Sequence, residues 1–253
     1  MEHLSFEKIN EVGILRINRP QVLNALNSAV LEEMRVFLEI TAREQKLKAV
    51  ILTGTGNKAF IAGADIREMQ GFDQKQMQLF CKLGQNVANI LETAPYLTIA
   101  AVNGYALGGG LEMALACDFI YASQHANFGL PEVSLGLIPG FGGNQRLTRA
   151  AGTRVAKELI MSGRSFTADK AKEIGVINQI CEPDALLQQS LDTAAEIIKN
   201  SFTAIIQAKR VINYSIEMST TEAEELERNV CAACFDTNER RIAMKTFLNN
   251  RKG

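Results

Sequence analysis

Segments with the period of a β-strand alternate with segments of helical period in the first part of this chain, and this alternation constrains the fold most. Val12 to Asn18 alternates apolar and polar residues, while Lys48 to Thr53 and Leu97 to Val102 are short apolar runs. Between the first two, apolar residues from Val30 to Leu38 recur on one face of a helix. Alternating strands and helices predict an α/β fold.

The connections between these segments are also partly readable. We expect a loop from Thr55 to Gly71, a helix that ends near Thr93, a short helix from Leu111 to Ala116 and a strand from Cys117 to Ala122. The short helix directly follows three consecutive glycines. A strand followed by glycines and a helix is a common setting for a binding site.

The last part of the sequence is mostly helical in pattern. Thr167 can cap a turn that Gly175 closes, and helical periodicity continues through Phe235 and Phe247. No linker rich in Pro or Ser separates the two parts. We therefore predict a core over residues 1–195 followed by a helical C-terminal region over residues 196–253.

Composition excludes several classes of protein. The chain has 27 Lys and Arg against 28 Asp and Glu, so no overall field would attract nucleic acid or an anionic membrane. No apolar run reaches the ~18 residues that a membrane span needs, and the N-terminus lacks the apolar region of a signal peptide. Five scattered cysteines do not form a disulfide framework. We expect a soluble, cytoplasmic protein.

Two glycine-containing loops are candidate ligand sites. The first, Ala62-Gly63-Ala64-Asp65, has small side chains that would let a ligand approach backbone amides, although, taken alone, an ordinary tight turn that requires Gly63 is the better explanation. The second, Gly108-Gly109-Gly110, precedes a helix, whose N-terminal N–H groups favour an oxyanion or a phosphate. Close packing of a helix on a strand would also require glycine.

Two glutamates stand in apolar surroundings. Glu112 lies in the first turn of the short helix, where the helix dipole alone favours an acidic residue. Its neighbours are apolar, however, and a buried carboxylate needs a partner or a purpose. Glu132 follows Pro131, which is also ordinary at a helix start. If the two carboxylates lie near each other, one can accept a proton while the other donates one.

Other site chemistries find little support. Cys231 and Cys234 form a CxxC, but no second pair or nearby His completes a zinc site, so we expect no metal. Gly54-Thr55-Gly56 lacks the third glycine of a dinucleotide fingerprint, and no Gly-Lys-Ser/Thr phosphate loop is present. With His3 and His125 as the two histidines, a Ser/His/Asp triad has few candidates, and His125 is expected in a surface loop.

An ordered set of motifs strongly resembles the crotonase family, over residues 5 to the C-terminus. The motifs are Asn18-Arg19-Pro20, Leu23-Asn24-Ala25-Leu26, Ala62-Gly63-Ala64-Asp65, Ala101 to Gly110, Phe128 to Glu132, Gly136 to Gly140 and Gln145-Arg146-Leu147. The resemblance implies a spiral of ββα units, a helical C-terminal region for oligomerisation and active-site cover, and a homo-oligomer that is a trimer or a dimer-of-trimers hexamer.

The resemblance also implies roles for individual residues. The backbone N–H groups of Ala64 and Gly109 would form an oxyanion hole for a thioester carbonyl. Glu112 would take a proton from the attacking water, and Glu132 would supply one to the α-carbon. Acyl-coenzyme A would be the substrate, with no cofactor. Further substrate contacts implied by the family are Ala25, Ala62, Gly63, Asp65, Ile66, Arg67, Gly108 and Phe247.

The chain departs from the family pattern where hydratases often carry lysines that contact coenzyme A. Gln21 and Asn250 stand at those positions. Arg19, Arg67, Arg251 and Lys252 could replace them, although basic residues are usually only solvated.

Family members that are hydratases carry glutamate at both of these positions, as this chain does. The resemblance therefore implies an enoyl-CoA hydratase that forms 3-hydroxyacyl-CoA in fatty-acid β-oxidation or short-chain acyl-CoA metabolism. A double-bond isomerase or another acyl-CoA lyase is the enzymatic alternative. An RNA-binding member of the same fold is the non-enzymatic alternative, against which the near-neutral charge counts.

Overall fold

A six-stranded sheet carries most of the apolar core. The computed structural model describes residues 1–250, and the strands of this sheet lie in the order β1-β2-β3-β5-β7-β10. β1 and β2 are antiparallel, and the other neighbours are parallel. Each residue of β3 and β5 is buried, as expected for apolar runs covered on both faces. The strands are β1 (Leu4–Ile9), β2 (Val12–Ile17), β3 (Ala49–Gly54), β5 (Leu97–Val102), β7 (Phe119–Ser123) and β10 (Gln179–Cys181).

A second, smaller sheet brings three loops together at one edge. Its order is β4-β6-β8-β9, in which β4, β6 and β8 are parallel and β9 is antiparallel to β8. Each of the three parallel strands follows a strand of the large sheet, in the pairs β3-β4, β5-β6 and β7-β8. Since parallel strands end at the same edge, the loops after β4, β6 and β8 lie side by side. The strands are β4 (Ala59–Ile61), β6 (Tyr105–Leu107), β8 (Asn127–Gly129) and β9 (Phe166–Thr167).

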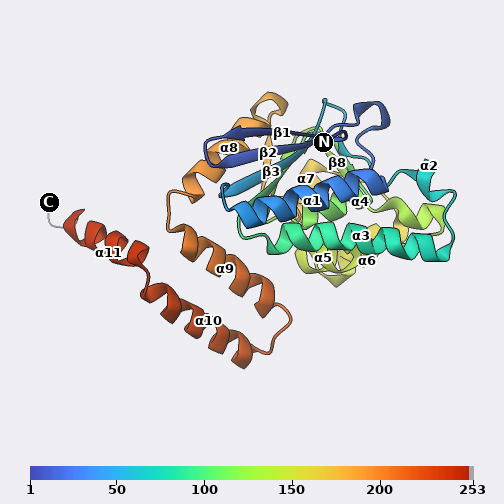
Figure 1. Ribbon diagram of the computed structural model, residues 1–253. Helices are drawn as coiled ribbons and strands as arrows, with labels where there is room; N and C mark the ends of the chain where they lie inside the picture. Colours follow the sequence, from blue (N-terminus) through green and yellow to red (C-terminus); the bar gives the residue numbers. More distant parts are fainter. Residues whose placement is uncertain (251–253) are drawn as a thin grey trace. The chain divides into compact units, whose positions relative to one another are not determined.

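Helices cover the sheets (Figure 1), and their ends follow local capping rules. The Asn27 side chain accepts a hydrogen bond from Val30 N at the start of α1, and Asp73 with Gln76 forms a capping box at the start of α3. The helices of the first part are η1 (Pro20–Val22), α1 (Ser28–Glu44), α2 (Ile66–Met69), α3 (Gln74–Thr93), α4 (Gly109–Leu115), η2 (Pro131–Leu135), α5 (Gly143–Ala151), α6 (Thr153–Ser162), α7 (Ala168–Glu173) and η3 (Pro183–Ala185).

The chain forms two compact units, Met1–Ala194 and the residues from Ala195 onward. The second unit is helical as far as the structure describes it. Its helices follow from α8 (Leu186–Ile197), which crosses the boundary, and are α9 (Phe202–Ser215), α10 (Thr220–Phe235) and α11 (Asn238–Asn250). The roles predicted for this region in oligomerisation and active-site cover stay predictions.

The α/β prediction with a helical C-terminal region is confirmed, and the differences concern short elements. The segment predicted as a loop from Thr55 to Gly71 contains β4 and α2, each too short to show a period. β1 was not predicted, because Leu4 is its one buried residue. The helix expected at Leu111 begins at Gly109 instead, although glycine has a low helix propensity.

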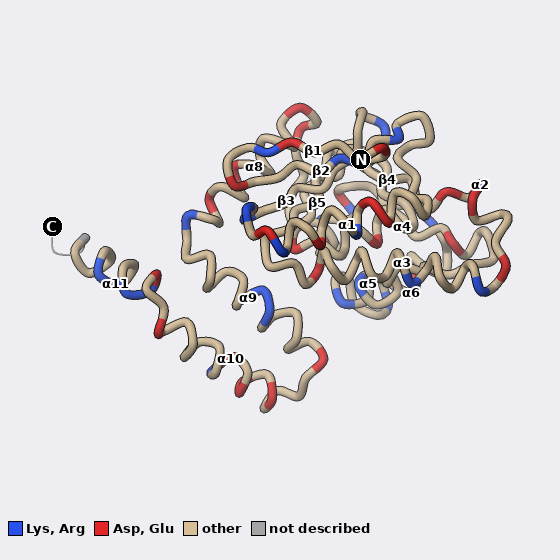
Figure 2. The backbone as a smooth tube through the Cα atoms, viewed as in Figure 1, with Lys and Arg blue, Asp and Glu red and all other residues tan. Residues whose placement is uncertain are grey.

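Charge and hydropathy show no concentration that would change this picture. Figure 2 shows Lys and Arg interspersed with Asp and Glu along the described backbone. Among residues 1–250, no helix combines the length and apolarity needed to cross a bilayer.

Candidate active site

Glu112 lies in the first turn of α4 and is almost completely buried. Only 1% of its surface is exposed, because α4 is buried along most of its length. Its Oε1 accepts hydrogen bonds from the backbone N–H of Phe141 at 2.8 Å and of Gly143 at 2.6 Å. Both bonds end on the same oxygen, so Oε2 keeps its acceptor capacity. A Cβ at Gly143 would lie 2.8 Å from Glu112 Cγ, which explains the glycine there.

Glu132 lies in the 3₁₀ turn η2, directly after β8. Pro131 at the first position of this turn fixes the backbone that carries the glutamate. The side chain is partly buried, and its Oε2 is buried with no hydrogen-bond partner among the described residues. A buried, unpartnered carboxylate oxygen is costly, and this cost favours the protonated carboxylic acid.

Gly108 is the residue of the glycine-rich loop after β6 that lies against Glu132. Its φ is +49°, a value that residues with a side chain rarely adopt. A Cβ at Gly108 would lie 2.6 Å from Glu132 Oε1. Glycine is therefore required at this position both by the backbone and by the carboxylate beside it.

Burial raises the pKa of both carboxyl groups. The pKa of Glu112 is raised to about 7, with desolvation as the largest cause and the charge of Glu132 as a further one. The N–H groups of Gly143 and Phe141 and the charge of Arg146 act in the opposite direction. Desolvation also raises the pKa of Glu132. A pKa close to neutral is what general acid–base chemistry near pH 7 requires.

The backbone N–H of Ala64 is not used by the bridge that holds its loop. Leu26 and Ala64 form an isolated parallel bridge, whose bonds run from Leu26 N to Gly63 O at 2.8 Å and from Asp65 N to Leu26 O at 2.7 Å. This pattern leaves the N–H of Ala64 out of the bridge. Ala62 N donates to Leu23 O, so the loop is fixed at its start as well.

The backbone N–H of Gly109 lies at the start of α4, where no carbonyl of the same helix can accept it. A Cβ built on Gly108 would lie 3.8 Å from Gly63 Cα, so the loops that carry Ala64 and Gly109 are in contact. Two backbone donors and the two glutamates therefore belong to neighbouring loops at one edge of the small sheet.

The other predicted contacts differ in where they lie. Asp65 caps α2 through the N–H of Arg67 and forms an ion pair with Arg19 at 3.0 Å, in which both side chains are largely buried. Arg19 also donates to the carbonyl of Ala25 at 2.6 Å, so it ties loops together. The side chains of Ile66 and Arg67 are exposed on α2.

The predictions for the C-terminal residues stay predictions. Phe247 lies on α11 in the second compact unit, with 56% of its surface exposed. Arg251 and Lys252 lie outside the described residues. No group of three or more His, Cys, Asp or Glu residues within the described part of the chain is placed to hold a metal ion.

Sequence reasoning assigned no role to three residues that surround Glu112. These are Phe141 and Gly143, which donate to it, and Arg146, which donates to the Phe141 carbonyl at 3.1 Å. The available signal was a glycine-rich stretch just before a helix. The pattern does not say which carboxylate such a stretch would meet.

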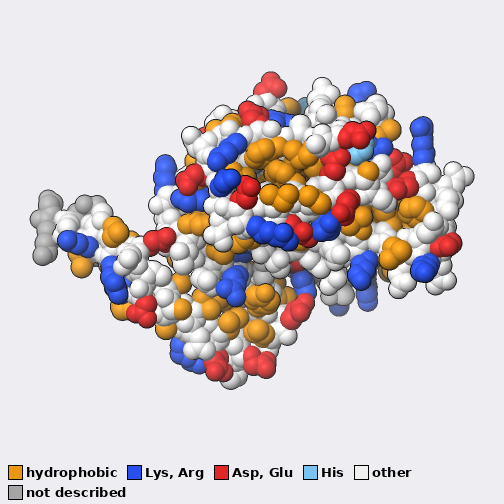
Figure 3. Space-filling view, in the orientation of Figure 1, with side chains coloured by type: hydrophobic (Ala, Val, Ile, Leu, Met, Phe, Trp, Pro, Cys, Tyr) orange, Lys and Arg blue, Asp and Glu red, His pale blue; other side chains and the backbone are white. Residues whose placement is uncertain are grey.

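A groove of about 530 Å³ lies elsewhere, between β1 and α1. Figure 3 shows hydrophobic side chains gathered over these elements. Its lining includes Phe6, Phe37 and Ile40 but none of the predicted site residues, so the groove is not the candidate active site.

Comparisons with known proteins show the family to which the chain belongs. The sequence model of the family described as enoyl-CoA hydratase/isomerase matches residues 7–253. The short-chain-enoyl-CoA hydratase of Clostridium acetobutylicum is 41% identical over 252 residues, covering 100% of this chain and 97% of the relative. The crotonyl-CoA hydratase of Syntrophomonas wolfei is 38% identical, covering 99% and 96%. The crystal structure of enoyl-CoA hydratase from Bacillus anthracis is 35% identical, with a TM-score of 0.95 over 98% of this chain and 96% of that one. The chain therefore belongs to the enoyl-CoA hydratase/isomerase family.

Proposed function

We propose that this chain is an enoyl-CoA hydratase, which reversibly adds water to trans-2-enoyl-CoA to give 3-hydroxyacyl-CoA. One observation carries the proposal: the buried Glu112, the partly buried Glu132 and two backbone N–H groups with no role in the local pairing occupy adjoining loops at one sheet edge. The names of the relatives from C. acetobutylicum and S. wolfei support a short-chain substrate.

In the proposed mechanism, Glu112 acts as the base and Glu132 as the acid. The water oxygen bonds to the β-carbon while its proton passes to the Glu112 carboxylate, whose Oε1 is already held by Phe141 and Gly143. The electron pair of the double bond moves toward the thioester, and the N–H groups of Ala64 and Gly109 stabilise the oxygen that becomes negative. The α-carbon then takes a proton from Glu132, whose unpartnered Oε2 suits a protonated group.

This scheme uses carboxyl and amide groups throughout. We expect no cofactor, and acyl-coenzyme A is the substrate. Substrate contacts by Ala25, Ala62, Gly63, Ile66 and Arg67 remain part of the proposal.

We also propose that the protein forms a homo-oligomer and is located in the cytoplasm. Several large apolar side chains of the second compact unit are exposed in the single chain, which supports a homo-oligomer, either a trimer or a hexamer of two trimers. The free cysteines support a reducing compartment such as the cytoplasm. A role in fatty-acid β-oxidation or in short-chain acyl-CoA metabolism follows from the substrate class.

The test is the loss of ultraviolet absorbance of crotonyl-CoA on hydration. We expect the wild type to turn over, and Glu112→Gln and Glu132→Gln each to lose ~10²–10⁴ in kcat at matched folded concentration. Glu173→Gln is the control, because this exposed carboxylate on α7 pairs with Lys170 away from the site. A wild type inactive on crotonyl-CoA and longer enoyl thioesters would contradict the proposal. Double-bond migration in a 3-enoyl-CoA would then indicate an isomerase.

A further inference from the structure

Arg146 is one of two charged side chains that are buried among the described residues, and the other is Glu112. Arg146 lies on α5, and 7% of it is exposed. A buried guanidinium is costly unless its donors are used, so its partners indicate what it is for.

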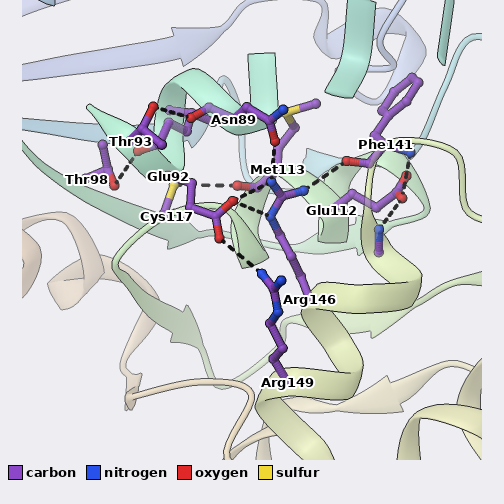
Figure 4. A network of polar contacts seen from close by, with 12 residues as sticks. Asn89, Glu92, Thr93, Thr98, Glu112, Met113, Cys117, Phe141, Arg146 and Arg149 are labelled. Carbon is purple, nitrogen blue, oxygen red and sulfur yellow. Dashed lines mark hydrogen bonds and ion pairs between the residues drawn. The ribbon is translucent and has the colours of Figure 1, made fainter. Parts of the chain in front are cut away.

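The guanidinium joins two helices and a turn (Figure 4). Nη2 donates to Glu92 Oε2 at 2.6 Å and to Asn89 Oδ1 at 2.9 Å, and Nε donates to Glu92 Oε2 at 3.2 Å. Both of these partners lie on α3. Nη1 donates to the Phe141 carbonyl at 3.1 Å. The planar fork of arginine can reach these separate acceptors at once, whereas the point charge of lysine cannot.

Phe141 connects this cluster to the candidate base. Its carbonyl accepts from Arg146, and its N–H donates to Glu112 Oε1. Arg146 also fills the space beside Gly142, where a Cβ would lie 2.2 Å from Nη1. The turn from Phe141 to Gly143 supplies both hydrogen bonds to Glu112. The Arg146 side chain contacts this turn and donates a hydrogen bond to it.

We propose that Arg146 is a positioning residue for the reaction, which fixes the turn from Phe141 to Gly143 and thereby the orientation of the Glu112 carboxylate. This inference rests on the proposed function, because it assigns Arg146 to the base of that mechanism. Arg146 does not itself hold the substrate in this account. Its loss therefore lowers kcat and leaves KM nearly unchanged.

The charged groups near Glu112 come from several elements. Glu132 on η2 raises the pKa of Glu112, and Arg146 on α5 lowers it. Cys81 on α3 is electrostatically coupled to Glu112, and Glu92 and Arg149 lie behind Arg146. Removing the charge of Arg146 therefore moves the pKa of Glu112 upward. Arg146→Lys keeps the positive charge, so it leaves the pKa of Glu112 near its original value. It loses the planar guanidinium that reaches several acceptors at once.

The test compares Arg146→Gln, Arg146→Lys and the control Arg149→Gln in the full-length protein. Arg149 also pairs with Glu92, at 3.8 Å, but its side chain is 31% exposed, against 7% for Arg146. With crotonyl-CoA we expect kcat to fall ~10²-fold in Arg146→Gln and ~10-fold in Arg146→Lys, with less than a ~2-fold change in the control. The acid side of the kcat/KM profile should move to higher pH in Arg146→Gln alone.

A second readout does not depend on turnover. By NMR, Arg146→Gln should speed hydrogen exchange of the Phe141 and Gly143 amides and raise the titration midpoint of the Glu112 carboxyl carbon. If the wild type lacks hydratase activity, the proposed function fails, and these two signals still decide the role of Arg146. Arg146→Lys gives the same test if Arg146→Gln does not fold. Unchanged amide exchange, or a fall in melting temperature with an unchanged kcat and pH profile, would overturn the inference.

Discussion

Glu112 and Glu132 have the same side chain but different surroundings. Glu112 lies on a helix, is 1% exposed, and has one oxygen held by two N–H groups with Arg146 behind them. Glu132 lies on a short 3₁₀ turn, is partly buried, and has one buried oxygen without a partner. The surroundings of Glu112 supply hydrogen-bond donors to its carboxyl group, whereas those of Glu132 leave one carboxyl oxygen without a donor.

This difference assigns different chemistry to identical groups. Desolvation raises the pKa of Glu112 to about 7, but its two hydrogen bonds and the charge of Arg146 act in the opposite direction. These contacts support the ionised form that a base must adopt before it accepts a proton. An unpartnered buried oxygen favours the protonated form of Glu132, which an acid must adopt before it donates. The surroundings, and not the residue type, thus separate the two proposed roles.

Gly108→Ala changes the surroundings of Glu132, and its expected effect, a loss of activity, is the largest. The new Cβ would lie 2.6 Å from Glu132 Oε1, and φ of +49° would strain an alanine. We expect kcat for crotonyl-CoA hydration to fall ~10²-fold or more, because a small displacement of a catalytic group is severe. Gly136→Ala is the control, since it also has positive φ but nothing within 4 Å of its Cβ. Equal activity of the two variants would contradict the role of Gly108.

Glu112→Gln sharpens the comparison through stability. The folded pKa of Glu112, about 7, exceeds its usual value of 4.5. The favourable contribution of its proton is therefore complete below pH 4.5 and is lost as pH rises through about 7. Glutamine does not titrate and has no such loss. Between pH 5 and pH 8, the free energy of unfolding of the variant should therefore rise by ~1–3 kcal/mol relative to that of the wild type. Urea unfolding at both pH values measures this, and an equal difference at both would refute it.

The smallest expected effect is the change in the pKa of Glu112 that Glu132→Gln should cause. When Glu132 is ionised, its negative charge raises the pKa of Glu112, so removal of this group should lower that pKa below about 7. Carbon-13 NMR of labelled glutamate follows the titration directly. The exposed-site variant Glu173→Gln should leave it unchanged, and an upward shift in Glu132→Gln would show that the carboxyls do not interact as described.

The sequence predicted the fold class and most long elements because their periods are clear. Leu97 to Val102 is a strand as predicted, and Asn27 caps α1. Short elements such as β4 escaped, because three buried residues show no period. Their pairing is nevertheless what places the candidate site, since β4, β6 and β8 end together.

The side-chain network was less predictable than the glutamates themselves. Glu112 and Glu132 could be selected because charged residues are unusual in apolar segments. The link from Arg146 through Phe141 to Glu112 joins residues that are up to 34 positions apart in the chain. Such contacts depend on how α5 meets α4, and no local pattern in the sequence contains this information.

The most direct test of the division of roles is exchange of the α-protons of butyryl-CoA in D₂O, followed by proton NMR. This saturated thioester cannot add water, so exchange needs the acid–base group at the α-carbon and the oxyanion donors but no base for water. We predict that Glu112→Gln retains most of the wild-type exchange rate, whereas Glu132→Gln loses it by ~10²-fold or more. Loss of exchange in Glu112→Gln together with retention in Glu132→Gln would contradict the assignment and reverse the two roles.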